Sequence, residues 1–288
     1  MKASVSVYHG ITKAAVQTYL PQRPKESHKG TYGKVLLLCG STGFTGAARL
    51  AAKAALRTGS GLVYLGVPEA VYPIVAAGLE EPVVFPLPCD ENGRLSLRAT
   101  DIIRDKLPSM DAILIGPGLG RSEELTRLLS LLLRECTVPV VLDADGINGL
   151  AAHKDLLRDR QCPLILTPHD GEFRRLFANV NMERREETVL AAKELSCIVL
   201  RKGYRTLITD GNTVFMNRTG NPGMAVGGSG DVLSGILVSL LGQGVPPLYA
   251  AALGAWIHGA AGDLAAIRLG EYGMLPSDLI LEIPQILK

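Results

Sequence analysis

Short continuous apolar runs recur between about residue 35 and residue 200, and glycines, turns or acidic residues follow them. Such runs are typical of strands that are buried on both faces of a parallel sheet. Segments with apolar residues at spacings of three and four lie between the runs, as in amphipathic helices. The pattern predicts strands at 35–39, 62–67, 83–85, 112–115, 138–142, 164–166, 197–200, 207–209 and 213–216.

The alternation of strands with helices predicts an α/β fold with three layers, α/β/α, in which a mainly parallel central sheet has helices on both faces. No repeat or low-complexity linker divides the chain, so residues 29–288 are expected to form one domain. Residues 1–28 are interpreted as an N-terminal arm with a short helix before Pro21 and Pro24. Helices are predicted at 47–57, 122–134, near 147, from 167, and at 184–195, 232–241, 248–269 and 276–287.

A glycine-rich loop at 221–231 precedes one of these helices and has the sequence Asn-Pro-Gly-Met-Ala-Val-Gly-Gly-Ser-Gly-Asp. A glycine loop that leads into a helix N-terminus favours an anion, because unpaired N–H groups and the helix dipole point at it. Gly228, Ser229 and Gly230 are therefore the predicted anion hole, and Asp231 is placed to take a proton from a substrate hydroxyl. The alternative is that Asp231 is simply a favourable residue in a first helical turn.

Three further loops follow predicted strands, and they are expected at one edge of the sheet, where open parallel sheets bind ligands. The loops at 40–46 and 116–120 are rich in glycine, which suits a close ligand or a tight turn. The loop at 40–46 matches neither the Gly-x-Gly-x-x-Gly fingerprint nor a P-loop. The third contains Asp143 and Asp145. Asp145 is interpreted as an N-cap, whereas Asp143 stays a candidate Mg²⁺ ligand.

Two more segments at this edge carry candidate binding residues. Thr167 is predicted as the N-cap of a helix with Pro168 at its first position, which places His169 at the rim of the sheet. Lys202 and Thr206 are candidates for contacts with a nucleotide phosphate or ribose, with a plain basic turn as the alternative. His258 is interpreted as a packed core histidine.

Composition excludes several classes of function. Hydrophobic residues make up 47% of the chain and charged residues 20%, and the net charge is +2. No dense basic stripe is present, so nucleic-acid binding is not expected, and no apolar run reaches the length of a membrane span. The absence of a signal-peptide core and of a Cys-x-x-Cys motif favours a cytoplasmic protein with reduced thiols and no zinc site.

Seven motifs in order resemble the ADP- or ATP-dependent NAD(P)H-hydrate dehydratases, which belong to the ribokinase-like superfamily. The departures are conservative: Ser229 stands where the family has Thr, and Gly146 where it has Ala. The epimerase domain that is fused to some relatives is not matched, so epimerisation is not expected. The motifs are Lys29-Gly30 with Gly33-Lys34, Gly40-Ser41 with Gly46-Ala47-Ala48, Gly116 to Gly120, Asp143-Ala144-Asp145, Leu166 to His169 with Gly171-Glu172, Lys202-Gly203, and Gly227 to Asp231.

The resemblance implies that the S epimer of hydrated NADH or NADPH is dehydrated with ADP or ATP and Mg²⁺. It implies a homo-oligomer, with tetramers plausible by analogy to the family. By this resemblance the hydrate contacts Ala47, Gly120, His169 and Asp231. The adenine nucleotide contacts Lys202, Gly203, Tyr204, Arg205, Thr206 and Gly230.

Three other functions remain open from the sequence. A kinase of a small alcohol or vitamin would use the same aspartate and anion hole, but would accumulate a phosphoester. A non-catalytic nucleotide sensor is disfavoured by the presence of Asp231, because a sensor has no need of a base. A nicotinamide oxidoreductase is disfavoured because the Gly-x-Gly-x-x-Gly fingerprint is missing.

Overall fold

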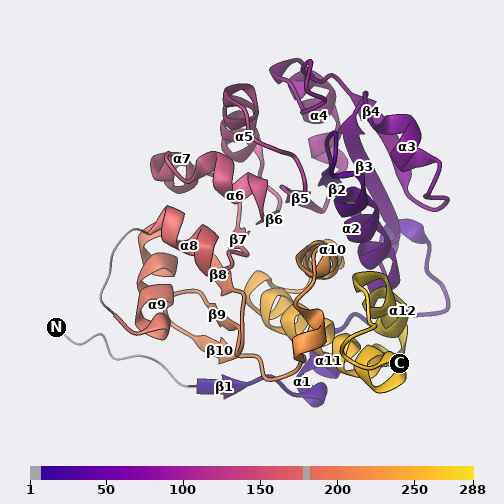
Figure 1. The fold of residues 1–288 in the computed structure, drawn as a ribbon, viewed down its shortest axis with the longest axis vertical. Helices are drawn as coiled ribbons and strands as arrows, with labels where there is room; N and C mark the ends of the chain where they lie inside the picture. Colours follow the sequence, from indigo (N-terminus) through magenta and orange to yellow (C-terminus); the bar gives the residue numbers. More distant parts are fainter. Residues whose placement is uncertain (1–7, 178–181) are drawn as a thin grey trace.

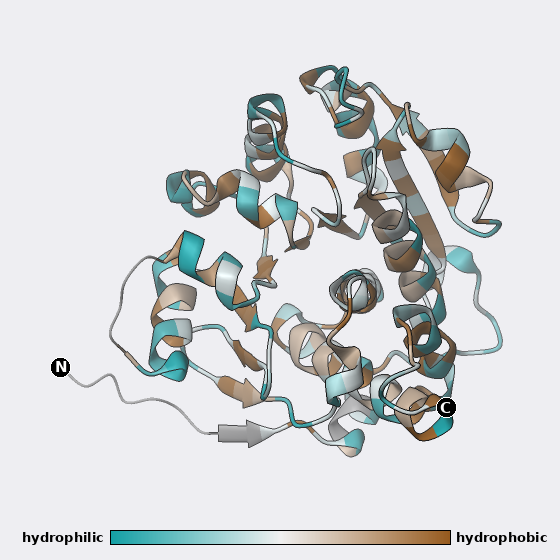
Figure 2. Ribbon diagram, in the orientation of Figure 1, coloured by the Kyte–Doolittle hydropathy of each residue, from teal (hydrophilic) through white to brown (hydrophobic). Residues whose placement is uncertain are grey.

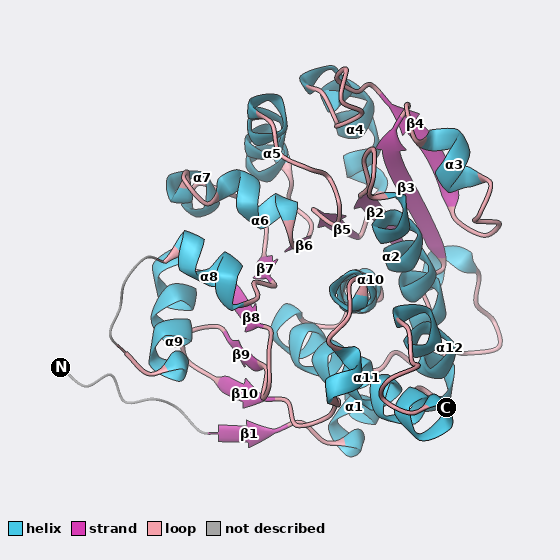
Figure 3. Ribbon diagram, viewed as in Figure 1, coloured by secondary structure: helices cyan, strands magenta, loops and turns pink. Residues whose placement is uncertain are grey.

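The computed structural model describes residues 8–177 and 182–288, which contain a ten-stranded sheet between two layers of helices (Figures 1 and 3). The strand order is β1-β10-β9-β8-β7-β6-β5-β2-β3-β4. This confirms the predicted α/β fold. The strands are β1 (Tyr8–Gly10), β2 (Lys34–Leu38), β3 (Leu62–Pro68), β4 (Val83–Leu87), β5 (Ala112–Ile115), β6 (Val140–Leu142), β7 (Leu164–Leu166), β8 (Ile198–Arg201), β9 (Leu207–Thr209) and β10 (Val214–Met216).

The sheet is parallel from β4 to β8 and becomes antiparallel at β8–β9 and β9–β10. The turn at 210–213 connects β9 to β10, and its backbone amides at Asn212 and Thr213 donate to the Asp210 carboxylate. Strand β1 was not predicted. It lies within the predicted arm and pairs in parallel with β10 at the sheet edge. An edge strand can be short and polar. The three residues of β1 therefore lack the apolar run by which the other strands were predicted.

Successive residues of each central strand point to opposite faces of the sheet. Val35 and Leu37 belong to one apolar core and Leu36 and Leu38 to the other, so each run is apolar throughout (Figure 2). The helices are α1 (Lys13–Tyr19), α2 (Thr45–Thr58), α3 (Tyr72–Ala76), α4 (Thr100–Lys106), α5 (Glu123–Glu135), α6 (Asp145–Leu150), α7 (Lys154–Arg158), α8 (Asp170–Leu176), α9 (Arg184–Leu195), α10 (Ser229–Gly242), α11 (Pro247–Leu269) and α12 (Pro276–Ile286).

Helix α10 is the most deeply packed helix near the site, since all but two of its residues are buried. It packs against α2 on the face that also holds α11 and α12 (Figure 1). A Cβ atom on Gly235 would lie 2.3 Å from the Ala51 carbonyl oxygen and 2.8 Å from the Ala54 Cβ. A glycine is therefore required at this crossing. The close contact fixes the position of the N-terminus of α10.

Helix α11 is long and apolar enough, by length and composition, to cross a membrane. In its most apolar window, 67% of the residues are buried inside the protein. The core helix of a globular protein meets the same criterion, so this helix is interpreted as part of the core. Its apolar character does not form one uninterrupted run in the sequence, because small and polar residues such as His258 and Asp263 interrupt the pattern.

Gly235→Val should lower the free energy of unfolding by about 1–3 kcal/mol, the usual cost of overpacking a core. Urea unfolding measures this change. Gly46→Ala is the matched control, because a Cβ there meets nothing within 4 Å and alanine is favoured over glycine in a helix. Equal stability of wild type and Gly235→Val would contradict this packing.

Candidate active site

Loops from neighbouring strands contact one another directly at the carboxyl edge of the sheet. The Gly40 amide donates to the Pro117 carbonyl at 2.8 Å, and the Ser41 hydroxyl donates to the Gly118 carbonyl at 2.7 Å. A Cβ on Gly118 would lie 3.0 Å from the Ala47 Cβ. The predicted convergence of the loops at 40–46 and 116–120 is thus present, and it places Ala47 beside the second loop.

The glycine-rich loop ends at the start of α10, as predicted, although the helix begins at Ser229 rather than at residue 232. Gly228 occupies the N-cap position with φ of 99°, a left-handed conformation that favours glycine. A Cβ there would also meet the Leu50 Cδ1 at 2.6 Å. The first amides of a helix have no carbonyl partners within the helix, and here the Ser229 amide donates to the Val226 carbonyl at 3.3 Å. The anion hole at Gly228, Ser229 and Gly230 stays a prediction. Asp231 lies in this first turn.

A buried ion pair lies beneath the start of α10. The Asp143 side chain is 1% exposed, and its Oδ1 accepts from the Lys202 Nζ at 2.7 Å. Its Oδ2 accepts from the Ser234 hydroxyl at 2.7 Å. A Cβ on Gly230 would lie 3.5 Å from that Nζ, so the ammonium of Lys202 is close to the anion site. The pKa of Asp143 is lowered: burial opposes this, but Lys202 and the hydroxyl donors outweigh it.

Each Asp143 oxygen already accepts one hydrogen bond, so a Mg²⁺ ion bound to Asp143 would share a carboxylate oxygen with Lys202 or Ser234. The predicted Mg²⁺ contact of Asp143, direct or through water, stays a prediction. Within the described residues, no group of three or more His, Cys, Asp or Glu side chains could hold a metal ion. Magnesium in phosphate-transfer sites keeps several waters and phosphate oxygens as ligands. The described residues therefore contain no cluster of carboxylates that could bind Mg²⁺ without phosphate or water ligands.

Asp231 is the carboxylate with the most strongly raised pKa in the site. The pKa of Asp231 is raised to about 7: burial is the largest cause, the charges of Asp143 and Asp145 also raise it, and Lys202 lowers it. A carboxylate with a pKa near neutrality is suited to accept a proton during a reaction. The burial and the charges around Asp231 therefore support the predicted base, whose role stays a prediction.

The two predicted N-caps in this region are wrong. Asp145 is the first residue of α6, and its Oδ2 accepts from the Gly120 amide at 2.9 Å instead of capping the helix. The Thr167 hydroxyl donates to the Leu142 carbonyl, and α8 begins at Asp170. In both cases the side chain bonds to a backbone group of a neighbouring strand or loop instead of to the first amides of the helix that follows it. Asp145 therefore fixes the position of Gly120.

His169 is the N-cap of α8. Its Nδ1 accepts from the Gly171 amide at 2.9 Å, and the His169 amide donates to the Glu172 carboxylate at 2.9 Å. These bonds form a capping box. With Nδ1 as an acceptor, the neutral ring carries its proton on Nε2, and its side chain is 54% exposed. The ring is therefore held in one orientation, and the predicted contact of His169 with substrate stays a prediction.

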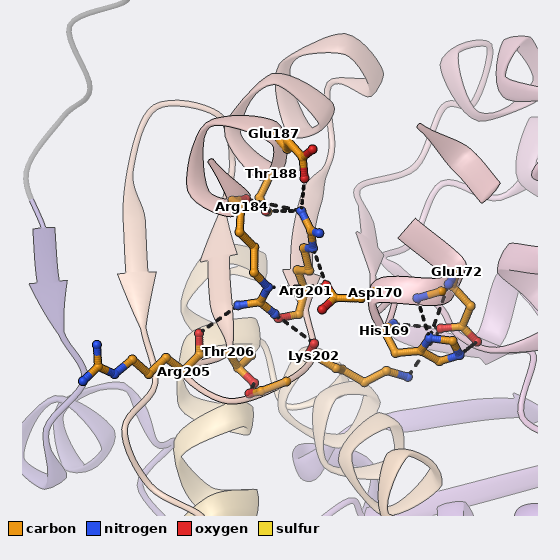
Figure 4. Close-up of polar contacts among 12 residues, drawn as sticks. His169, Asp170, Glu172, Arg184, Glu187, Thr188, Arg201, Lys202, Arg205 and Thr206 are labelled. Carbon is orange, nitrogen blue, oxygen red and sulfur yellow. Dashed lines mark hydrogen bonds and ion pairs between the residues drawn. The ribbon is translucent and has the colours of Figure 1, made fainter. Parts of the chain in front are cut away.

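The backbone of the loop at 202–206 is held by a side chain from another element (Figure 4). The Arg184 guanidinium, at the start of α9, donates to the carbonyls of Arg201, Lys202 and Arg205 at 3.1, 2.9 and 3.3 Å. Gly203 and Arg205 have φ of 144° and 55°. One guanidinium thus stabilises a backbone that is unusual in conformation.

The side chains of this loop diverge. Lys202 points toward Glu172 and the core of the site, whereas Arg205 points to the opposite side (Figure 4). Tyr204 and Arg205 line a separate cleft of about 390 Å³ together with Arg184 and Leu207. The structure therefore brings Lys202, Gly230 and Asp231 together, but it does not bring Tyr204 and Arg205 to the same point.

Arg201 and Ser234 belong to the site architecture and were not singled out from the sequence. Arg201 is 4% exposed, and its guanidinium bonds to Asp170 at 2.7 Å and to Glu187 at 2.8 Å. An arginine at the last position of an apolar run was the available signal. Ser234 gave none, because a serine in an apolar helix is ordinary.

Comparison with known proteins places this site in a family. The family model of the NAD(P)H-hydrate dehydratases matches residues 35–285. The chain is 45% identical over 284 residues to the bifunctional NAD(P)H-hydrate repair enzyme of Moorella thermoacetica, covering 96% of this chain and 53% of that relative. It is 38% identical over 267 residues to the ADP-dependent (S)-NAD(P)H-hydrate dehydratase of Neisseria meningitidis serogroup B, covering 89% and 86%. The chain spans about half the length of the bifunctional relatives.

Solved structures agree with this result. An ADP/ATP-dependent NAD(P)H-hydrate dehydratase from Bacillus subtilis, co-crystallised with ATP and Mg²⁺, is 31% identical with a TM-score of 0.82, covering 96% of each chain. A ribokinase-like superfamily protein from Enterococcus faecalis has a TM-score of 0.84 at 25% identity, covering 96% of this chain and 94% of that one. The resemblance carried by the seven sequence motifs is confirmed.

Lys202→Met should raise the pKa of Asp231 above about 7, because the Lys202 ammonium stabilises the charged form of that carboxylate. NMR titration of ¹³C-labelled aspartate carboxyls measures the shift. Lys193→Met, on the exposed side of α9, is the control and should leave the titration unchanged. An unchanged Asp231 pKa in Lys202→Met would contradict the electrostatic coupling.

Proposed function

Because the chain belongs to the NAD(P)H-hydrate dehydratase family, we propose that it dehydrates the S epimer of hydrated NADH or NADPH. The co-substrate is ADP or ATP, and the products are the reduced nicotinamide cofactor, phosphate, and AMP or ADP. The observation that carries the proposal is a carboxylate with a raised pKa, Asp231, in the first turn of a helix that begins with a glycine N-cap.

The first chemical step is phosphoryl transfer to the hydrate. Asp231 removes the proton from the ring hydroxyl as its oxygen attacks the terminal phosphoryl group. The bond between that phosphorus and the bridging oxygen breaks, so AMP leaves from ADP, or ADP from ATP. In this proposal the phosphoryl oxygens bind at Gly228, Ser229 and Gly230, where the Ser229 amide already donates to the Val226 carbonyl at 3.3 Å. The Lys202 ammonium lies beside Gly230.

The second step is elimination. The ring carbon–oxygen bond breaks and inorganic phosphate carries the oxygen away. The neighbouring ring carbon loses a proton to solvent, and the electron pair of that C–H bond restores the double bond of the reduced nicotinamide. A phosphate is a far better leaving group than hydroxide, which is why a nucleotide is consumed.

Two sets of contacts position the substrates in this proposal. Ala47, Gly120 and His169 contact the hydrate. The loop at 202–206, with Gly230, contacts the nucleotide. The contacts between the loops around Ala47, Gly118 and Gly120 support the first set. Arg184, which holds the loop carbonyls, supports the second.

Magnesium is proposed to arrive with the nucleotide phosphates, by analogy with the Bacillus subtilis dehydratase that was co-crystallised with ATP and Mg²⁺. A homo-oligomer, tetrameric by analogy with the family, and a cytoplasmic location complete the proposal. The odd number of scattered cysteines and the free thiols support a reducing compartment.

A kinase of a small alcohol is the second candidate, since a hydroxyethylthiazole kinase shares the fold with a TM-score of 0.64 at 17% identity. Such a kinase would use the same base and anion site. The two functions differ in the fate of the phosphoester: a kinase releases it intact, whereas the dehydratase eliminates phosphate.

The purified protein, with hydrated NADH, Mg²⁺ and ADP or ATP, should release phosphate in a one-to-one ratio with NADH. Absorbance of the reduced nicotinamide and a phosphate assay measure the two products in parallel. Omission of the nucleotide should abolish both signals. A phosphorylated product that persists without NADH would favour the kinase.

Asp231→Asn should lower the turnover number by roughly 10² or more, because general-base help is worth about 10² to 10⁴ in rate. In the wild type, the turnover number should rise with pH up to about 7 and then level off, since Asp231 must be unprotonated to act. Steady-state kinetics from pH 5 to pH 9 measure both effects. Nucleotide affinity should change little. A variant as fast as the wild type would exclude Asp231 as the base.

A further inference from the structure

Helix α11 contacts the first residue of α10 through a histidine that the proposed reaction does not use. The His258 Nε2 lies 3.2 Å from the Ser229 hydroxyl. Ser229 is buried and His258 is half-buried. This contact joins the predicted anion site to a helix on the other side of the glycine-rich loop.

Polar contacts from α11 also anchor the segment that precedes the anion site. The Asp263 carboxylate accepts from the Gly220 amide at 2.9 Å and from the Asn221 side chain at 3.1 Å. The Asn217 side chain donates to the Ala255 carbonyl at 3.0 Å. The glycine-rich loop is therefore fixed to α11 at its beginning, before the chain reaches Ser229.

The same face of α11 has glycines where the loop approaches most closely. A Cβ on Gly259 would lie 2.3 Å from the Thr219 Oγ1, and a Cβ on Gly262 would lie 2.3 Å from the Met224 Sδ. Gly259 shares a face of the helix with Gly262 and Asp263, and His258 is a neighbour of Gly262, since residues three and four apart lie side by side. The loop thus lies directly on α11, with His258 nearest to the anion site.

We propose that His258 is a positioning residue for phosphoryl transfer: it donates from its ring to Ser229 and thereby directs the Ser229 hydroxyl proton toward the phosphoryl oxygens. This role of His258 rests on the proposed function, because its effect on rate is an effect on the proposed phosphoryl transfer. A serine hydroxyl has one proton. If the ring donates to the hydroxyl oxygen, that proton is free to bond to a substrate anion.

The surroundings of the ring favour the neutral form that this role requires. Burial lowers the pKa of His258 to about 4, and the positive charge of Lys202 lowers it as well, while a hydrogen bond with the Ser229 backbone opposes the change. A neutral ring carries one N–H. With that hydrogen on Nε2, the ring donates to the Ser229 hydroxyl oxygen across the 3.2 Å contact.

His258→Leu should lower the turnover number roughly 10- to 100-fold, less than the 10²- to 10³-fold loss that removal of a whole anion-hole donor causes. The KM for the hydrate should stay within about threefold, because the loss falls on the transition state. His258→Gln keeps a donor near the Nε2 position and should recover most of the rate. His153→Leu, an exposed histidine before α7, is the matched control and should match the wild type.

A double-mutant cycle tests whether His258 acts through Ser229. The double variant Ser229→Ala/His258→Leu should turn over at nearly the rate of Ser229→Ala alone, since coupled residues are not additive. If the double variant loses rate by the product of the two single-variant losses, His258 does not act through Ser229 and the inference is overturned. The inference is also overturned if His258→Leu turns over at the wild-type rate. It is overturned likewise if the lost rate matches the fraction of unfolded protein measured in urea and His258→Gln does not restore it.

NMR of ¹⁵N-labelled histidine tests the contact without any turnover. In the wild type, His258 should show the neutral Nε2–H tautomer from pH 8 to pH 5, and Ser229→Ala should shift the Nε2 resonance. An ordinary titration near pH 6.5 and a resonance that Ser229→Ala leaves unchanged would overturn the inference even in an active enzyme. A wild type that produces no NADH but shows the expected tautomer and shift would instead overturn the proposed function.

Discussion

The ion pair between Asp143 and Lys202 determines how the site is arranged. A carboxylate that is 1% exposed needs partners for its charge, and here the partners come from the end of β8 and from α10 through Ser234. Breaking such a pair on one side typically costs about 3–5 kcal/mol, because a buried charge is left uncompensated. The pair therefore connects the sheet edge, the loop at 202–206 and the start of α10 in one unit.

The reactivity of Asp231 depends on the balance of charges around that unit. Burial, Asp143 and Asp145 raise its pKa, and Lys202 lowers it, so that the result is about 7. Because the folded pKa lies above the usual value for aspartate, the contribution of this group to stability is full at acidic pH and is lost as the pH rises through about 7. The charged base that the reaction needs is thus present at a cost in stability.

The sequence predicted the fold well and the site in part. Buried parallel strands are apolar on both faces, so their runs are visible, and glycine loops mark the sheet edge. Contacts between distant segments leave no local signal: Asp145 bonds to Gly120 rather than capping its own helix, and Thr167 bonds to Leu142. The ion pair of Asp143 could not be predicted from the sequence, because its partner Lys202 lies 59 residues away.

The start of α10 is held from two sides, and this matters for an incoming phosphoryl group. On one side Asp143 already balances the charge of Lys202, so the pair as a whole offers little net positive charge to an anion. The remaining attraction must come from fixed backbone amides and hydroxyl protons, whose value depends on their orientation before substrate arrives. The contacts of α11 with the loop, from Asp263 to His258, provide that orientation on the other side.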